Sequence, residues 1–233
     1  MIKVVFFDLY HTLATYAPSR EVFIAGVLKE FDTEREPETL GRPLAVADEF
    51  FAKENASNPI SKRSHEEQAN AFTQYQTIFL KEAGIQPSMG LIKTLMERWQ
   101  QAGFKLSLFE DVVPVLSELR QKGFQTGLIS NVEQEAAPLL EKLGLTQLLD
   151  FVITSVNTGF TKPQPEIFLA ALEQAGVNSE EAIFVGDQYQ VDILGAQRVG
   201  IKGILLDRGG YSKDKGDGLH IRNLHQLAEH LAA

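Results

Sequence analysis

A run of apolar residues near the N-terminus, 2–7 in IKVVFFDLYHTLA, ends at an acidic residue, Asp8. Apart from Lys3 the run is β-branched or aromatic and does not alternate with polar residues, which is typical of a strand buried on both faces of a parallel sheet. An ionisable residue at the carboxyl end of such a strand lies where open α/β sheets bind their ligands. Asp8 alone could merely end the strand and cap a turn. The same pattern recurs at 183–187, however, where a second apolar strand ends at Asp187.

Residues 18–102 show helical patterning and no strand pattern. We expect helices over 21–31, 44–53, 65–83 and 89–101, because Pro37, the Gly-Arg-Pro at 41–43, the Asn-Pro at 58–59 and the stretch 84–87 are typical of helix ends. Aromatic residues recur here at helical spacing, and we interpret them as the core of a helical bundle in preference to a substrate pocket. They are Phe50, Phe51, Phe72, Tyr75, Phe79 and Trp99.

Strand and helix patterns alternate from about residue 109 to the end of the chain. Strands are expected at 125–129, 151–154, 183–185 and 203–206, and helices at 111–121, 133–143, 165–175, 191–199 and 224–231. Alternating units of this kind form a parallel sheet with helices on both faces. The predicted fold is therefore an α/β doubly wound, Rossmann-like core made of residues 1–14 and 106–233. An all-helical second domain, residues 15–105, is inserted after the first strand.

The composition excludes several classes of function. The chain has 22 basic and 31 acidic residues, a net charge of −9, and such an acidic protein is a poor candidate for binding nucleic acid. It has no cysteine, so disulfides and thiolate chemistry are ruled out. No apolar run approaches the length of a membrane span, and the N-terminus begins with a core strand rather than a signal peptide. We expect a cytoplasmic protein that binds neither nucleic acid nor a membrane.

Polar signals follow four segments at or near the expected strand ends, and in a doubly wound sheet these ends meet at one crevice. Carboxylates gathered there can bind a hard cation such as Mg²⁺. A hydroxyl, a lysine and free backbone N–H groups can bind an anion. A carboxylate acting as a nucleophile would complete a phosphoryl-transfer site. The signals are Asp8 with Thr12, Ser130-Asn131, Lys162-Pro163, and Gly186-Asp187 followed by Asp192.

The segments FFDLYHTLA, GLISN, GFTKPQPEIF and FVGDQYQVDILGAQRVGI resemble those of the haloacid dehalogenase-like hydrolases. The resemblance covers the whole chain and identifies the helical insertion with that family's cap domain. It implies that Asp8 is the nucleophile and that Mg²⁺ is bound by Asp8, Asp187 and the backbone carbonyl of Tyr10. It also implies that Ser130, Asn131 and Lys162 bind the phosphoryl group, that Thr12 shapes the first loop and contributes to the phosphate site, and that Asp192 acts in the outer shell.

One residue departs from the phosphatase pattern. Phosphatases of this family carry a second aspartate two residues after the nucleophile as a general acid, and here that position is Tyr10. A tyrosine there resembles the 2-haloacid dehalogenases, whose halide leaving group needs no proton. Those enzymes use no metal and lack the Gly-Asp that this chain keeps as Gly186-Asp187. His11 is the one nearby side chain with an ordinary pKa suited to replace the acid.

Three functions remain open on these grounds. The first is a Mg²⁺-dependent phosphatase acting on a small phosphorylated metabolite through an aspartyl phosphate. The second is a metal-independent 2-haloacid dehalogenase, which needs a cationic group for the substrate carboxylate and could take Arg20, Arg35 or Arg42. The third is a catalytically weak member that binds a phosphorylated ligand or a protein. We prefer the first because Asp187 is retained. The physiological substrate and the oligomeric state are not encoded in any motif that we recognise.

Overall fold

The computed structural model describes residues 1–132, 134–212 and 219–231, and the chain divides into two compact units. One unit combines Met1–Thr15 with Leu106–Ala233, and the other is the inserted segment Tyr16–Lys105. We describe each unit by itself. The first contains the sheet and the candidate site, and the second is built from helices.

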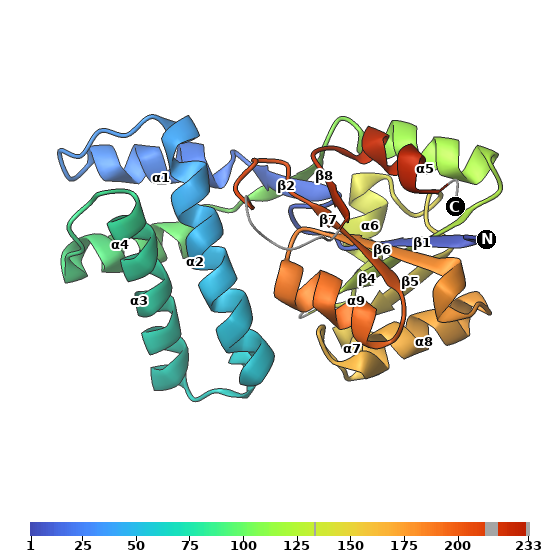
Figure 1. The fold of residues 1–233 in the computed structure, drawn as a ribbon. Coiled ribbons are helices and arrows are strands. Elements are labelled where there is room, and N and C mark those ends of the chain that lie inside the picture. The colour runs from blue at the N-terminus through green and yellow to red at the C-terminus, as the bar shows by residue number, and fades with distance from the viewer. Residues whose placement is uncertain (133, 213–218, 232–233) are drawn as a thin grey trace. The chain divides into compact units, whose positions relative to one another are not determined.

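A six-stranded parallel sheet forms the centre of the first unit (Figure 1). Its order is β5-β4-β1-β6-β7-β8, and every neighbouring pair is parallel. The chain passes from β1 toward β4 and β5 and then returns to β6 on the other side of β1, so the order reverses between β1 and β6. The strands are β1 Val4–Phe7, β4 Gln125–Ser130, β5 Phe151–Thr154, β6 Ala182–Gly186, β7 Lys202–Leu206 and β8 Leu219–Ile221.

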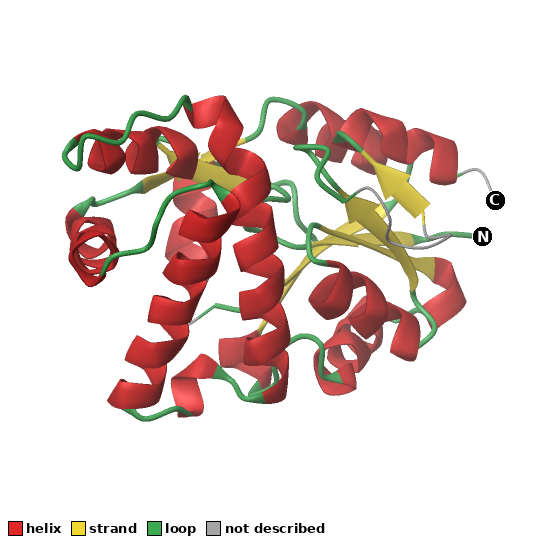
Figure 2. Cartoon of the chain, turned by 60° about the vertical axis from the view of Figure 1, so that its left-hand side comes forward, coloured by secondary structure: helices red, strands yellow, loops and turns green. Residues whose placement is uncertain are grey.

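Helices cover both faces of this sheet (Figure 2), which confirms the predicted fold class. The expected helix at 133–143 begins only at residue 137, directly before a proline that favours the first helical turn. Residue 133 lies outside the described residues. The expected helix at 191–199 starts as a π-helical turn. These elements are α5 Val112–Gln121, α6 Ala137–Leu143, α7 Ser155–Thr158, α8 Pro165–Ala175, η2 Ser179–Glu181, η3 Tyr189–Ile193, α9 Leu194–Arg198 and the 3-10 helix η4 Leu224–His230.

The apolar run of β1 is buried on both faces, as its sequence predicts. Val5 and Phe7 pack in the cluster that contains residues of α5, α6 and η4. Val4 and Phe6 pack in the cluster that contains residues of α8 and α9. All four side chains are fully buried, and each contributes about 1.5–3 kcal/mol by leaving water. Because β1 is fixed on both faces and by two neighbouring strands, the residue that follows it has a well-defined position.

The inserted unit has its own apolar core. Buried side chains of all four α-helices meet in one cluster, which includes Leu28, Leu44, Phe79 and Leu95. Of the aromatic residues expected in the core, Phe79 is fully buried in this cluster and Tyr75 packs against it. Phe72 is 40% exposed and stacks on Phe51 at 5.5 Å between ring centroids. The elements are α1 Arg20–Lys29, α2 Pro37–Ser57, η1 Ile60–Lys62, α3 His65–Glu82 and α4 Met89–Gln101.

The prediction of a helix break at 41–43 is wrong, because α2 continues through Pro43. A proline inside a helix removes one backbone hydrogen bond and costs about 3 kcal/mol. Here Leu40, Leu44 and Ala47 on either side of it are fully buried in the core of the unit, and this burial offsets the cost. Among the described residues, no helix combines the length and apolar character required to cross a membrane.

Two short strands lie where the inserted segment joins the first unit, at positions for which the sequence predicts no strand. β2 Ala14–Ala17 and β3 Lys105–Leu108 pair with each other in a separate two-stranded sheet. Each strand is only four residues long, and most of its residues are half-buried or exposed. Neither sequence contains the apolar run that identifies a core strand. The short edge strand β8 was missed for the same reason. The two linkers between the units are thus paired strands rather than loops.

Candidate active site

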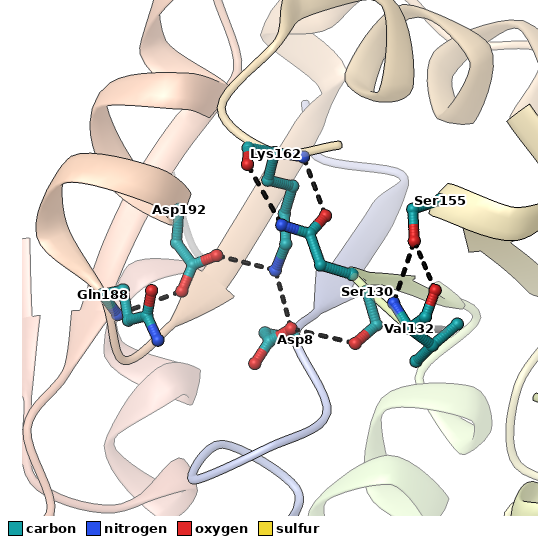
Figure 3. Close-up of polar contacts among 8 residues, drawn as sticks. Asp8, Ser130, Val132, Ser155, Lys162, Gln188 and Asp192 are labelled. Atoms are coloured by element: carbon teal, nitrogen blue, oxygen red, sulfur yellow. Dashed lines mark hydrogen bonds and ion pairs between the residues drawn. The ribbon is translucent and has the colours of Figure 1, made fainter. Parts of the chain in front are cut away.

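Residues from all four sequence signals meet at the carboxyl edge of the sheet (Figure 3). Phe7 of β1 is in register with Leu128 of β4 and with Val185 of β6, so these three strands end at nearly the same level. Asp8 follows β1, Ser130 ends β4, and Asp187 follows β6. This edge is where the strand order reverses, the position at which open α/β sheets bind ligands.

Lys162 links two carboxylates at the centre of this cluster. Its Nζ donates to Asp8 Oδ1 at 2.6 Å and to Asp192 Oδ1 at 2.7 Å (Figure 3). The lysine side chain is 3% exposed, and those of Asp8 and Asp192 are 10% and 2% exposed. The ammonium also lies 5.1 Å from the ring centroid of Phe184. One buried positive charge therefore serves two negative ones, so the cluster keeps a net negative charge.

The protonation of this cluster follows from its burial and its ion pairs. Burial alone would lower the pKa of Lys162, but the carboxylates of Asp192 and Asp8 outweigh it and raise that pKa. Burial also raises the pKa of Asp192 to about 6, against the opposing attraction of Lys162. Lys162 therefore stays charged at neutral pH. Lys162 acts as a fixed cation and not as a proton donor.

A π-helical turn and a glycine fix the position of Asp192. The turn η3 follows β6, and in it the amide of Gln188 donates to Asp192 Oδ2 at 3.0 Å. A β-carbon at Gly186 would overlap the Asp192 carboxylate, so only glycine admits this acid beside the strand end. Both oxygens of Asp192 are thereby engaged, one by Lys162 and one by the backbone. Its main role is to hold Lys162 rather than to present a free oxygen.

The two oxygens of Asp8 differ in their surroundings. Ser130 Oγ donates to Oδ1 at 3.2 Å, and Lys162 donates to the same oxygen. Within the described part of the chain, no hydrogen bond reaches Oδ2. Oδ1 is therefore held in place, and Oδ2 is left to attack an electrophile or to bind a cation.

The loop after Asp8 is a tight turn. Leu9 O accepts from the amides of Leu13 and Ala14, and the amide of His11 donates to Ala14 O at 2.7 Å. His11 has φ +58°, an uncommon left-handed backbone for a non-glycine residue. Tyr10 and His11 are half-buried, and a backbone bridge joins Tyr10 to Ala14. These contacts fix where the main chain of Tyr10 lies.

Thr12 lies deeper than a phosphate ligand should. The residue is fully buried, and its hydroxyl makes no hydrogen bond with any residue that the structure describes. Its backbone carbonyl accepts from Arg208 Nη2 at 2.9 Å. The structure therefore favours the predicted role of Thr12 in shaping the first loop over a direct contact with phosphate.

The side chain of Asn131 binds both main-chain polar groups of Lys162, the amide and the carbonyl. Its Oδ1 accepts from the Lys162 amide at 2.8 Å, and its Nδ2 donates to the Lys162 carbonyl at 3.0 Å. Nδ2 carries a second N–H, so the expected phosphate contact stays a prediction. Ser155, which no sequence motif indicated, binds the main chain of Val132, the residue after Asn131. Its Oγ accepts from Val132 N at 2.9 Å and donates to Val132 O at 2.7 Å (Figure 3). No motif marks Ser155, because it begins α7, directly after β5 and outside the four signals.

Three carboxylates lie close enough to hold a metal ion. One oxygen from each of Asp8, Asp187 and Asp192 lies within 4.8 Å of the other two. A set made only of carboxylate oxygens suits a hard cation such as Mg²⁺. The resemblance implies Asp8 and Asp187 as ligands, whereas both oxygens of Asp192 accept hydrogen bonds from Lys162 and Gln188. The donor set thus fits the expected cation.

Comparisons with known proteins agree with this geometry. Residues 44–206 match the family described as haloacid dehalogenase-like hydrolases. A glyceraldehyde 3-phosphate phosphatase from Methanopyrus kandleri is 30% identical over 91% of this chain and 86% of its own. The crystal structure of a HAD phosphatase from Thermococcus onnurineus is 26% identical, with a TM-score of 0.60 over 99% of this chain and 98% of that one. A 2-haloacid dehalogenase from Pseudomonas syringae pv. Tomato is 29% identical, with a TM-score of 0.60 over 100% and 99%.

The motif resemblance is therefore confirmed by matches that extend over both units, including the helical insertion. Neither the identities nor the TM-scores of the two solved structures separate phosphatase from dehalogenase chemistry. What the matches share is the hydrolase family, and this chain belongs to it: it is a haloacid dehalogenase-like hydrolase.

Proposed function

We propose that this hydrolase is a Mg²⁺-dependent phosphatase that cleaves a small phosphorylated metabolite through an aspartyl phosphate on Asp8. The observation that carries the proposal is the pairing of opposite charges at one strand edge. Lys162 and Ser130 hold one oxygen of Asp8, while Asp187 offers a second carboxylate within 4.8 Å. A divalent cation would offset the excess of carboxylates over Lys162 in this cluster, and the cation and Lys162 together would attract an anionic phosphoryl group.

Asp8 and Asp187, with the backbone carbonyl of Tyr10, would hold the Mg²⁺. The metal would supply charge neutralisation for the phosphoryl oxygens. Asp192 would not bind it directly, because its oxygens are engaged by Lys162 and Gln188. Its contribution is to keep Lys162 charged and in place.

The chain's own residues account for the two chemical steps. One carboxylate oxygen of Asp8 attacks phosphorus, the bond from phosphorus to the leaving oxygen breaks, and that oxygen takes up a proton. Water then attacks the phosphorus of the aspartyl phosphate, which restores the carboxylate and releases inorganic phosphate. Lys162 and Ser130 bind the transferring group throughout, and His11 is the candidate proton donor in the first step.

The relatives support a small phosphorylated substrate. They include proteins named glyceraldehyde 3-phosphate phosphatase, ribulose-1,5-bisphosphate 5-phosphatase and phosphoserine phosphatase. These names cover a sugar bisphosphate, a triose phosphate and a phosphorylated amino acid. The substrate of this chain therefore belongs to the class of small phosphomonoesters.

One observation favours the dehalogenase as a second candidate, namely Tyr10 in place of the second aspartate. That chemistry needs a free cation for the substrate carboxylate. Arg20, one expected source, is held by both oxygens of Asp48 at 2.9 and 2.7 Å. Arg35, another, donates to three backbone carbonyls within the helical unit. Of the three arginines, only the exposed Arg42 makes no such bond among the described residues. Because Arg20 and Arg35 are already held by other groups, the dehalogenase is the weaker of the two functions.

A pair of assays separates the two functions. Purified protein is tested for Mg²⁺-dependent phosphate release from a panel of small phosphomonoesters, and for halide release from 2-chloropropionate in the presence of a chelator. A phosphatase releases phosphate, loses this activity with chelator, and loses it in Asp8→Asn. Halide release that survives the chelator would overturn the proposal in favour of the dehalogenase.

We also propose that the helical unit acts as the cap that selects the substrate. Its separate core makes an independent test possible. Deleting residues 18–102 and joining the ends should leave a core that still binds Mg²⁺ but no longer discriminates among the phosphomonoesters of the panel. An unchanged ranking of substrates in the shortened protein would contradict the specificity role.

A further inference from the structure

We infer that Arg208 is a positioning residue for the loop that carries the nucleophile, and that Asp111 holds Arg208 in the required orientation. This inference deepens the proposed function and rests on it where turnover is concerned. Arg208 lies outside every motif noted in the sequence. It follows β7, whose end is two strands away from β1 in the sheet order.

The side chain of Arg208 joins three separate parts of the unit. Nη2 donates to the carbonyl of Thr12 at 2.9 Å and to Asp111 Oδ1 at 2.9 Å, and Nη1 donates to Asp111 Oδ2 at 2.9 Å. The guanidinium carbon lies 3.9 Å from the ring centroid of Phe109. The fork of donors and the flat face of the guanidinium are both in use, and lysine offers neither.

Asp111 is itself fixed. It precedes α5, its side chain is 8% exposed, and its Oδ2 accepts from the backbone amide of Leu224 at 2.8 Å. The backbone of the first loop is bound on the same side, because the amide of Phe109 donates to Leu13 O at 3.1 Å. Arg208 is therefore held on a rigid base made from α5 and η4.

The bond to Thr12 acts on the geometry of the site. Thr12 belongs to the turn that begins at Asp8, and its hydroxyl has no partner among the described residues, so its carbonyl is the polar group by which it is held. The turn also contains Tyr10, whose carbonyl is a proposed metal ligand, and His11 in a left-handed conformation. A loop in a strained conformation persists only where surrounding contacts fix it. Arg208 supplies the side-chain contact that does so.

Hydrogen exchange can test this without metal or substrate. The amides of His11, Leu13 and Ala14 are bonded within the turn and therefore report its opening. In Arg208→Lys the charge beside Asp111 remains, but one ammonium cannot replace the fork. We expect exchange of these three amides to rise about tenfold, as for the loss of one hydrogen bond, with exchange in β4 unchanged.

Arg222→Met is the matched control. Arg222 also pairs with a buried acid, since Nη1 donates to the carbonyl and Oδ2 of Asp207 at 3.1 and 3.3 Å, and it has no contact with residues 8–13. In Arg222→Met, the amides of His11, Leu13 and Ala14 should exchange as they do in the wild type. The double variant Arg208→Met/Asp111→Asn removes the pair without leaving a buried charge and guards against misfolding of a single variant.

Kinetics supply the second readout. For a phosphomonoester that the wild type turns over, Arg208→Lys should lower kcat about tenfold or more while changing KM less than about twofold, because misplacing reacting groups affects the chemical step. A general loss of stability would not produce this split. Unchanged exchange at the three amides, or unchanged kcat, would overturn the inference. A wild type that releases no phosphate from any ester would overturn the proposed function instead, and exchange would then decide on Arg208 alone.

Discussion

The side-chain amide of Asn131 holds the backbone of Lys162 through two hydrogen bonds, accepting from its N–H and donating to its C=O. Residues from two loops are thereby fixed to each other beside the nucleophile. The ammonium of Lys162 reaches Asp8 from a backbone that cannot shift independently of the β4 end. Asn131 thus holds the main chain from which the Lys162 ammonium extends, and its contact with phosphate stays a prediction.

Replacing Asn131 by alanine should therefore affect activity through Lys162. Two half-buried hydrogen bonds are lost, which should lower the free energy of unfolding by about 1–3 kcal/mol. We expect kcat to fall at least about tenfold because the ammonium is no longer held at Asp8. Chemical denaturation and steady-state kinetics measure the two effects. Asn157→Ala, at an exposed asparagine of α7, is the control, and a kcat equal to that of the wild type in Asn131→Ala would contradict the positioning role.

The metal assignment predicts a specific loss in Asp187→Asn. An amide offers one neutral oxygen in place of a charged carboxylate, so Mg²⁺ affinity and activity should decrease together. Titration calorimetry with Mg²⁺ measures the affinity. Asp150→Asn is a suitable comparison, because Asp150 pairs with Arg120 away from the three clustered acids. If Asp187→Asn binds Mg²⁺ as tightly as the wild type, Asp187 is not a ligand.

Tyr10 predicts a preference for good leaving groups. A positioned general acid contributes about 10²–10⁴-fold to expulsion of an alkoxide, equal to roughly 3–5 kcal/mol of barrier, whereas nitrophenolate leaves without a proton. Tyr10→Asp should raise kcat for alkyl phosphates and leave nitrophenyl phosphate nearly unchanged. Equal wild-type rates for both classes in the chemical step would show that another group donates the proton, and His11→Ala would then identify or exclude His11.

Asp207 predicts how stability depends on pH. Burial raises its pKa, but bonds from the amides of Ser212, Tyr211 and Gly210 and the charge of Arg222 outweigh this and lower it below the ordinary 3.8. A carboxyl with a lowered pKa stabilises the fold above its unfolded pKa, and this stability is lost as the pH falls through the folded pKa.

Wild-type protein should therefore lose unfolding free energy below about pH 4, and Asp207→Asn should lose less of it over the same range. Denaturation curves from pH 7 to pH 3 measure this. Glu166→Gln, at an exposed position of α8, should follow the wild-type curve. If the unfolding free energy of Asp207→Asn falls with pH as steeply as that of the wild type, Asp207 does not contribute to the pH dependence of stability.

Much of the fold was predictable because single segments encode it. The apolar run that precedes Asp8 is buried on both faces, and this burial can be predicted from the run alone, without the rest of the sequence. Asp8, Ser130 and Asp187 were predictable because each lies at the end of a strand, and parallel strands end at one edge. The uninterrupted α2 was not predictable, since packing of Leu40 and Leu44 against other helices outweighs the local effect of Pro43.

Two residues that contact distant backbone groups gave no such signal. Ser155 and Arg208 bind backbone groups 23 and 196 positions away in the chain. Asn131 was singled out, but its bonds to the main chain of Lys162, 31 positions away, were not expected. A distance of that kind is set by the completed fold and not by local pattern. Arg208 follows a strand as the motif residues do, but a single arginine at that position has many possible partners.

The central position of β1 has a consequence for how the chain is made. Val4 pairs with Gln125 on one side and with Ala182 on the other, so this strand completes its pairing only after both neighbours have been synthesised. The helical segment makes its contacts within residues 16–105 and can fold meanwhile. Until residue 186 has emerged, the apolar face of β1 stays uncovered and aggregation-prone. An incomplete chain therefore carries a folded insertion and an exposed first strand, which is the form that a chaperone would bind.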